Sequence, residues 1–106
     1  MQNIDAYLEH IRRDYVRFMD AMAASAEVRQ RMIDEFNTKL AVSEGKKYIK
    51  VLSNGAAHSF IVKEDAGKFK AGDILKTATW AAPATNFARG NVLRADWKRV
   101  HWTGAQ

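Results

Sequence analysis

The feature that most constrains the fold is an apolar stripe in the first quarter of the chain. Six large apolar residues recur there at alternating gaps of four and three: Ile4, Leu8, Ile11, Tyr15, Phe18 and Met22. Since an α-helix has 3.6 residues per turn, this spacing puts all six on one side of a helix. Asn3 is a suitable N-cap. The pattern predicts an amphipathic helix of about 20 residues.

A second apolar stripe follows a short break, and Ser25 is a suitable N-cap for it. Its members are Val28, Met32, Ile33, Phe36 and Leu40. Two amphipathic helices joined by a short link indicate an antiparallel hairpin over residues 1–44. The stripe spans only about three heptads, so we expect core packing rather than a coiled-coil seam. A homodimer through the hairpin is the alternative.

The pattern changes from helical to extended after residues 43–45. Gly45 suits the break at a helix C-terminus. Residues 47–52 and 58–63 read as strands joined by a tight hairpin, because Asn54-Gly55 is the strongest short hairpin signal. Three further strands are predicted, over residues 74–80, 91–93 and 97–102.

The predicted fold is α+β in a single domain of 106 residues. The helical hairpin packs on a small, mostly antiparallel sheet of four to five strands within residues 45–106. Short strands with glycine turns also allow a partly open barrel. Residues 81–87 contain the only proline and are expected to form a loop. Residues 103–106 are expected to fray.

Charge is distributed unevenly along this chain, whose formal net charge is +5. Residues 1–44 hold 6 Lys/Arg and 8 Asp/Glu, a net of −2, whereas residues 45–106 hold 11 and 4, a net of +7. The basic part favours an anionic partner such as nucleic acid, a nucleotide or an acidic protein surface. A solvated lysine-rich surface that aids solubility is the alternative.

Several classes of function lack their sequence signals. The chain has no cysteine, which indicates a reducing cytosol without disulfides. It has no apolar run of membrane-spanning length and no signal peptide at its start, so no membrane partner is expected. The three histidines lack metal-site spacing, and no serine sits in a nucleophile elbow. We therefore expect no metal, no cofactor and no enzymatic activity.

A basic and aromatic group is the best candidate for a site. Aromatic rings stack on nucleobases, and arginine pairs with phosphates. The candidate ligand-binding or nucleic-acid-binding residues are Lys68, Lys70, Lys76, Arg89, Asn91, Trp97, Arg99 and His101. Trp80 and Trp102 are expected in the core, and Trp97 fits either role. Arg89 has a structural interpretation, in which it hydrogen-bonds carbonyl groups of residues 81–86 and holds that loop.

Six segments carry a resemblance to a known family. They are IDAYLEHIRRDYVRF (4–18), RMIDEFN (31–37), KYIKV (47–51), HSFIVK (58–63), KFKAGDILKTATWAAPATNFARGNV (68–92) and WTGA (102–105). In these segments the chain resembles small uncharacterised proteins encoded by tailed bacteriophages. The resemblance implies a phage or prophage origin and action in the cytoplasm of the infected host cell. It implies no reaction and no site residues.

Two main hypotheses for function follow. The first is a non-enzymatic binding protein that modulates a host protein or captures an anionic ligand such as a nucleotide. The second is a nucleic-acid-binding protein that uses the basic and aromatic face. A structural or virion-associated protein is a further alternative.

Overall fold

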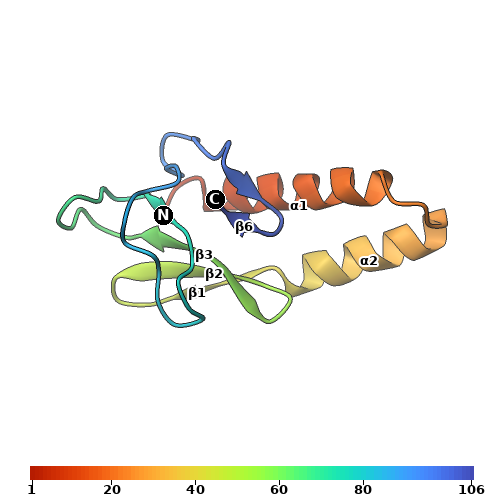
Figure 1. The fold of residues 1–106 in the computed structure, drawn as a ribbon, viewed down its shortest axis with the longest axis horizontal. Coiled ribbons are helices and arrows are strands. Elements are labelled where there is room, and N and C mark those ends of the chain that lie inside the picture. Colours follow the sequence, from red (N-terminus) through yellow and green to blue (C-terminus); the bar gives the residue numbers. More distant parts are fainter.

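The computed structural model describes all 106 residues. Helix α1 (Ile4–Asp20) and helix α2 (Ala26–Lys39) form a hairpin that extends to one side of the sheet (Figure 1). The molecule is elongated, with extents of 48 × 24 × 23 Å. The α+β prediction is confirmed, and the sheet stays open rather than closing into a barrel.

Four antiparallel strands form the main sheet in the order β1-β2-β3-β4. They are β1 (Ala41–Glu44), β2 (Tyr48–Ser53), β3 (Ala56–Val62) and β4 (Ile74–Leu75). A separate antiparallel pair, β5 (Val100–His101) and β6 (Gly104–Ala105), lies near the N-terminal half of α1 (Figure 1). The predicted Asn54-Gly55 turn joins β2 to β3, and both residues have positive φ, 54° and 79°, as a type I′ turn requires.

The end of the hairpin differs from the prediction. Helix α2 ends at Lys39, and residues 41–44 form strand β1, which was assigned to the helical part. Gly45 does not terminate a helix; its N–H donates to the Tyr48 carbonyl in the β1–β2 turn. Residues 41–44 pair with residues 49–52 of β2, and this contact with a distant partner is not revealed by local periodicity.

Two predicted strands are shorter in the structure, and a third is absent. The strand expected at 74–80 stops at Leu75, and the one expected at 97–102 contains only Val100 and His101. Residues 91–93 form no strand; Asn91 makes isolated bridges to Asp73 and Asp96. The C-terminus does not fray, because β6 pairs with β5 and Ala105 is buried.

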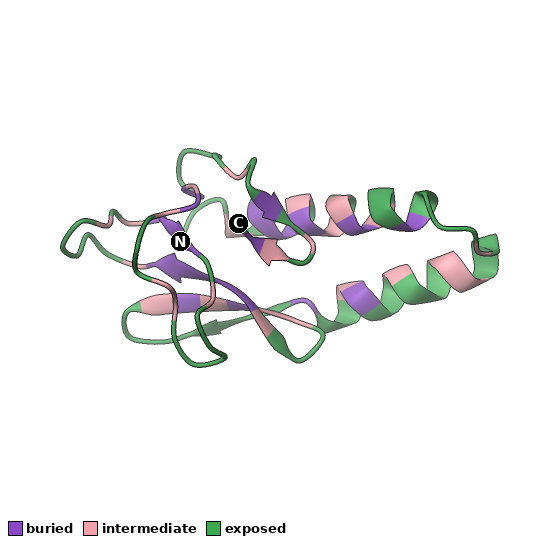
Figure 2. Ribbon diagram, viewed as in Figure 1, coloured by how far each residue is buried: buried purple, intermediate pink, exposed green.

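The main sheet has two faces with different coverings. Paired residues of an antiparallel sheet share a face, so Ile49, Ile61 and Ile74 lie together on an inner face that belongs to the main core under the helices. Lys50, Phe60 and Leu75 lie together on the outer face. Burial is concentrated in strands β2, β3 and β4 and along one side of α1, whereas β1 and most of α2 are exposed (Figure 2).

The apolar stripe of α1 is rotated from its predicted position. Tyr7 and Met19 are fully buried, whereas Phe18 and Met22 are 42% and 43% exposed. The distal part of the hairpin extends beyond the sheet (Figure 1), so apolar spacing there does not ensure burial. Within α2 only Phe36 is buried.

The two helix starts differ in their capping. Ser25 caps α2, accepting the N–H of Val28 through Oγ at 3.2 Å. Asn3 makes no side-chain cap for α1, contrary to the prediction. Its Nδ2 instead donates to the carbonyl of Val92 at 3.0 Å and ties the chain start to the segment after β4.

Candidate functional site

Two of the predicted site residues are buried and support loops. Asn91 donates from Nδ2 to the Ala71 carbonyl at 3.0 Å and to Oδ1 of Asp73 at 2.9 Å. These bonds support the turn at Gly72, whose φ of +89° favours glycine. A Cβ at Gly72 would lie 2.8 Å from Cγ of Leu93, so this position has no room for a side chain.

Arg89 holds its own loop in place. Its Nε donates to the Phe87 carbonyl at 3.3 Å, and Nη2 donates to Oδ1 of Asn86 at 3.2 Å. Its guanidinium lies 3.9 Å from the Phe87 ring centroid. Lys68 donates to the Asn86 carbonyl from the neighbouring loop. Arg89 thus has a structural role in its loop, but its partners are the Phe87 carbonyl and the Asn86 side chain rather than the predicted carbonyl groups of residues 81–86.

Three other predicted residues, Trp97, Arg99 and His101, lie on the helix side of the sheet, away from Lys68 and Arg89. Trp97 is half-buried against the main core, with its ring centroid 5.9 Å from those of Tyr7 and His10. His101 pairs with Asp14 at 3.9 Å. Arg99 is exposed in the turn just before β5. The predicted group of eight is thus divided between two sides of the molecule.

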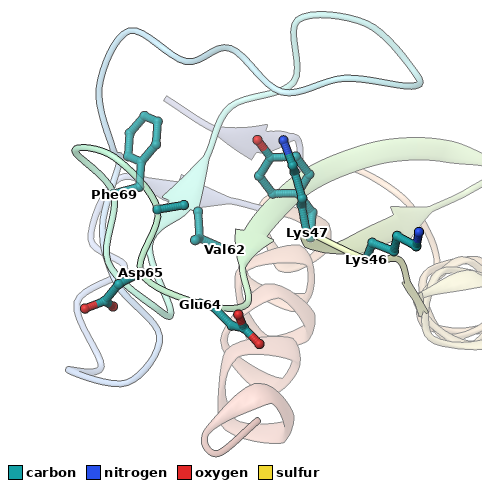
Figure 3. A pocket seen from close by; sticks show the side chains of 8 residues that line it. Lys46, Lys47, Val62, Glu64, Asp65 and Phe69 are labelled. Carbon is teal, nitrogen blue, oxygen red and sulfur yellow. The ribbon is translucent and has the colours of Figure 1, made fainter.

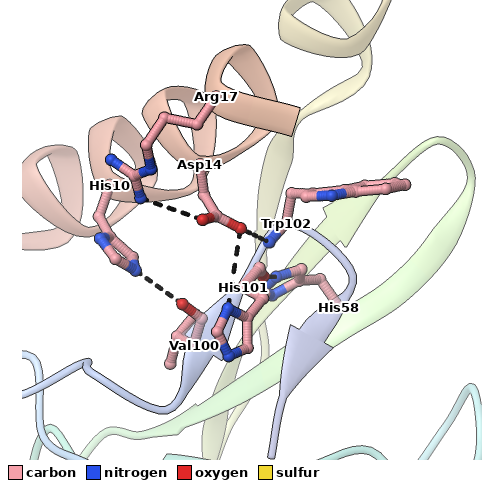
Figure 4. Close-up of polar contacts among 7 residues, drawn as sticks. All are labelled: His10, Asp14, Arg17, His58, Val100, His101 and Trp102. Atoms are coloured by element: carbon pink, nitrogen blue, oxygen red, sulfur yellow. Dashed lines mark hydrogen bonds and ion pairs between the residues drawn. The ribbon is translucent and has the colours of Figure 1, made fainter. Parts of the chain in front are cut away.

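All three histidines gather around the β5–β6 hairpin (Figure 4). His10 donates from Nε2 to the Val100 carbonyl at 2.7 Å, and His58 donates from Nε2 to the His101 carbonyl at 2.7 Å. Asp14 accepts the N–H of Trp102 at 2.8 Å. Partial burial opposes ionisation of Asp14, but this bond and the nearby Arg17 and His101 charges give it a pKa below the usual value.

A buried hydrogen-bond chain continues from His58. Since Nε2 donates, Nδ1 accepts from Oγ of Ser59 at 2.9 Å, and the Tyr7 hydroxyl donates to the same Oγ at 2.7 Å. Burial lowers the pKa of His58 and raises that of Tyr7. Ser59 is fully buried, so a substrate cannot reach its hydroxyl in this conformation. This hydrogen-bond chain links α1 to β3 and stabilises the fold.

The arrangement that can meet a ligand lies on the outer face, and the sequence analysis did not identify it. Phe60, Val62 and Leu75 form a second small core there, with Tyr48, Phe69 and Ala88 packed against it. Residues 76–90 cross this face as a loop (Figure 1), closed by a bridge between Thr77 and Pro83.

Trp80 is displayed at the tip of that loop. It is 57% exposed, so the expectation that it is a core residue is wrong. Strand β4 ends five residues earlier, and a turn held by Oγ1 of Thr79, which accepts the N–H groups of Ala81 and Ala82, carries the ring outward. Lys50 lies beneath the ring, with Nζ 3.5 Å from its centroid. Trp102, by contrast, packs on the main core as expected.

Two adjoining hollows run along this face and share Lys46, Lys47 and Tyr48. The first, about 290 Å³, is lined by these three with Val62, Glu64, Asp65, Ala66 and Phe69 (Figure 3). The second, about 230 Å³, is lined by these three with Ser43, Gly45, Lys50, Phe60 and Ala81. We call the two hollows together the outer groove.

The outer groove is cationic. Lys46, Lys47 and Lys50 line it and make no ion pair. Residues 45–63 contain four lysines and no acidic residue. The acid-free run, together with the alternation that puts Tyr48 and Lys50 on one side of β2, is the sequence signal for this site.

No three His, Asp or Glu side chains lie close enough together to share a metal ion. Neither helix combines the length and hydropathy that crossing a bilayer requires. The outer groove presents lysine ammonium groups beside the aromatic rings of Tyr48, Phe60 and Phe69.

Comparison with known proteins gives one match. No curated protein and no solved structure is significantly similar to this chain. The model of a family of unknown function, DUF7717, matches residues 1–106. The chain therefore belongs to that family over its whole length.

Proposed function

We propose that the protein is a non-enzymatic binding module whose outer groove binds single-stranded nucleic acid. The observation that carries this proposal is the exposed Trp80 ring with the Lys50 ammonium group 3.5 Å from its centroid, at the border of a lysine-lined groove. Single strands are bound by grooves that follow the phosphates and by aromatic rings that stack on bases.

The contacts divide the work between phosphates and bases. Lys46 and Lys47 make no ion pair, so their charges are available to the ligand, that of Lys46 to a phosphate. Lys50 occupies one side of the Trp80 ring. Trp80 is 57% exposed, which leaves accessible surface for a base. Arg89 supports the loop that presents Trp80, Asn91 supports the turn at Gly72, and neither contacts the ligand in this proposal.

The test is fluorescence anisotropy with a labelled oligo-dT of about 10 nucleotides at about 50 mM salt. We expect binding that weakens steeply with salt, and Lys46→Ala should reduce the magnitude of the slope of log K against log salt by about 0.7, the value for one phosphate contact of a single strand. Lys39→Ala, on exposed α2, removes the same charge away from the groove and should leave the slope unchanged. Absence of binding at this salt concentration contradicts the proposal.

A protein partner is the second candidate, and the helical hairpin favours it. Phe18, Met22 and Met32 are 42%, 43% and 38% exposed near its distal end. Such a patch suits a host protein or, as the alternative, a second copy of this chain. Light scattering coupled to gel filtration distinguishes them. A dimer that Met22→Glu dissociates supports self-association, whereas a monomer favours a host protein as the partner.

The setting of this activity is also a proposal. The resemblance to tailed-phage proteins supports a phage or prophage origin and action in the cytoplasm of the host cell. Phage genes on both sides of the coding sequence would support this setting. Recovery of the protein from purified particles by mass spectrometry would instead support the virion-associated alternative.

A further inference from the structure

One end of the outer groove differs in chemistry from the rest. The pocket of about 290 Å³ combines Lys46 and Lys47 with Glu64 and Asp65, beside the rings of Tyr48 and Phe69. Figure 3 shows Phe69 and Lys47 on opposite sides of it, with Glu64 at its lower edge. Carboxylates repel phosphates, so this end suits a flat polar group rather than the backbone of a strand.

The two carboxylates are not equivalent. Oδ1 of Asp65 accepts the N–H of Ala71 at 2.8 Å, and Oδ2 lies 4.0 Å from Nζ of Lys70. Asp65 is therefore engaged in shaping the loop between β3 and β4. Glu64 is exposed and makes no ion pair, so both of its oxygens are available as acceptors.

This donor and acceptor set matches one nucleobase. Guanine presents two neighbouring donors, N1–H and N2–H, to which a carboxylate can bind with both oxygens. Its O6 and N7 are acceptors that lysine recognises. Thymine would place carbonyl oxygens against the carboxylate, and adenine offers one amino donor beside an acceptor nitrogen.

We propose that this pocket binds a guanine base of the strand held in the groove. Glu64 accepts N1–H and N2–H, Lys47 donates to O6 or N7, and the ring packs against Tyr48 or Phe69. This inference rests on the proposed function, and it adds base preference to a groove that otherwise reads phosphates and stacking surfaces.

The experiment compares labelled oligo-dT strands of about 10 nucleotides that carry dG, dI, dA or dT at one central position. One bidentate base contact predicts binding of the dG strand about tenfold tighter than the dT strand. The dI strand lacks the N2 amino group and should lose most of that preference. The dA strand controls for the stronger stacking of purines.

The variant Glu64→Gln separates recognition from charge. Removing a negative charge raises affinity for every strand alike, so the measured quantity is the dG to dA ratio, which should fall to about one. Glu27→Gln, at an exposed site on α2, removes the same charge and should keep the ratio.

Two results overturn the guanine pocket while oligo-dT still binds. One is equal affinity for the dG and dA strands, and the other is a preference for dG over dA that survives Glu64→Gln. Failure of oligo-dT itself to bind is a different result, because it overturns the proposed function on which the pocket rests.

Discussion

The two faces of the main sheet show how one pair of strands serves two purposes. On the inner face, Ile49, Val51 and Ile61 are buried under the helices. On the outer face, the alternate residues include Lys50, whose ammonium group stays near the surface against Trp80. The inner face is filled by apolar side chains, whereas the outer face carries Lys50, which forms no ion pair.

The largest expected effect is on the inner side. Ile11 is fully buried in α1, and Ile11→Asp would place an unpaired charge in the core. We expect a loss of several kcal/mol in the free energy of unfolding, measured by urea denaturation. Arg13→Asp, on the exposed side of the same helix, should cost less than about 1 kcal/mol. Equal losses in the free energy of unfolding for the two variants would remove the distinction between the buried and exposed sides of α1.

A smaller loss is expected in the buried hydrogen-bond chain. Tyr7→Phe removes the hydroxyl that donates to Oγ of Ser59, and we expect a loss of about 1–2 kcal/mol in the free energy of unfolding. The ring of Tyr48 lies on the outer face. Tyr48→Phe therefore removes a hydroxyl outside the buried hydrogen-bond chain and is the matched control. If both changes have the same small effect on the free energy of unfolding, the Tyr7–Ser59–His58 hydrogen bonds do not stabilise the inner side.

The pH dependence of stability sharpens the comparison, because His58 is buried on the inner side, beside Tyr7 and Ser59. Burial lowers its pKa from 6.5, so the unfolded chain takes up a proton that the folded protein resists. Stability is full above about pH 6.5 and declines as the pH falls below that value. Urea denaturation between about pH 7.5 and about pH 5.5 should show the decline. It should shrink in His58→Gln; a decline that persists there belongs to another group.

The smallest expected effect on stability is at Trp80. Because the ring is 57% exposed, Trp80→Ala should change the free energy of unfolding by less than about 0.5 kcal/mol. The same change should weaken oligonucleotide binding by about 1–3 kcal/mol, and Trp80→Phe should restore most of the loss. A variant that binds normally would show that Trp80 does not stack on the ligand.

Much of the fold was predictable because its signals are local. Helical spacing predicted α1 and α2, and Asn54-Gly55 predicted the β2–β3 turn. Strand β1 and the C-terminal pair depend on partners elsewhere in the chain, such as β2 for β1. No local pattern contains that information.

The candidate site was less predictable than the fold. Lys68, Lys76 and Arg89 come from the loops around the outer face, but Lys46, Lys47 and Lys50 were not selected. Trp97 was paired with these loops although it packs on Tyr7. The strand pattern shows that a face exists, but which face the helices cover is a property of the assembled fold.

The central claim is that the outer groove is the binding face, and residue-resolved NMR tests it most directly. During titration of the labelled protein with oligo-dT, the account predicts that backbone shifts move at Lys46, Lys47 and Lys50 and that the Trp80 indole N–H moves with them. Changes confined to Trp97, Arg99 and His101, on the helix side of the sheet, would contradict it.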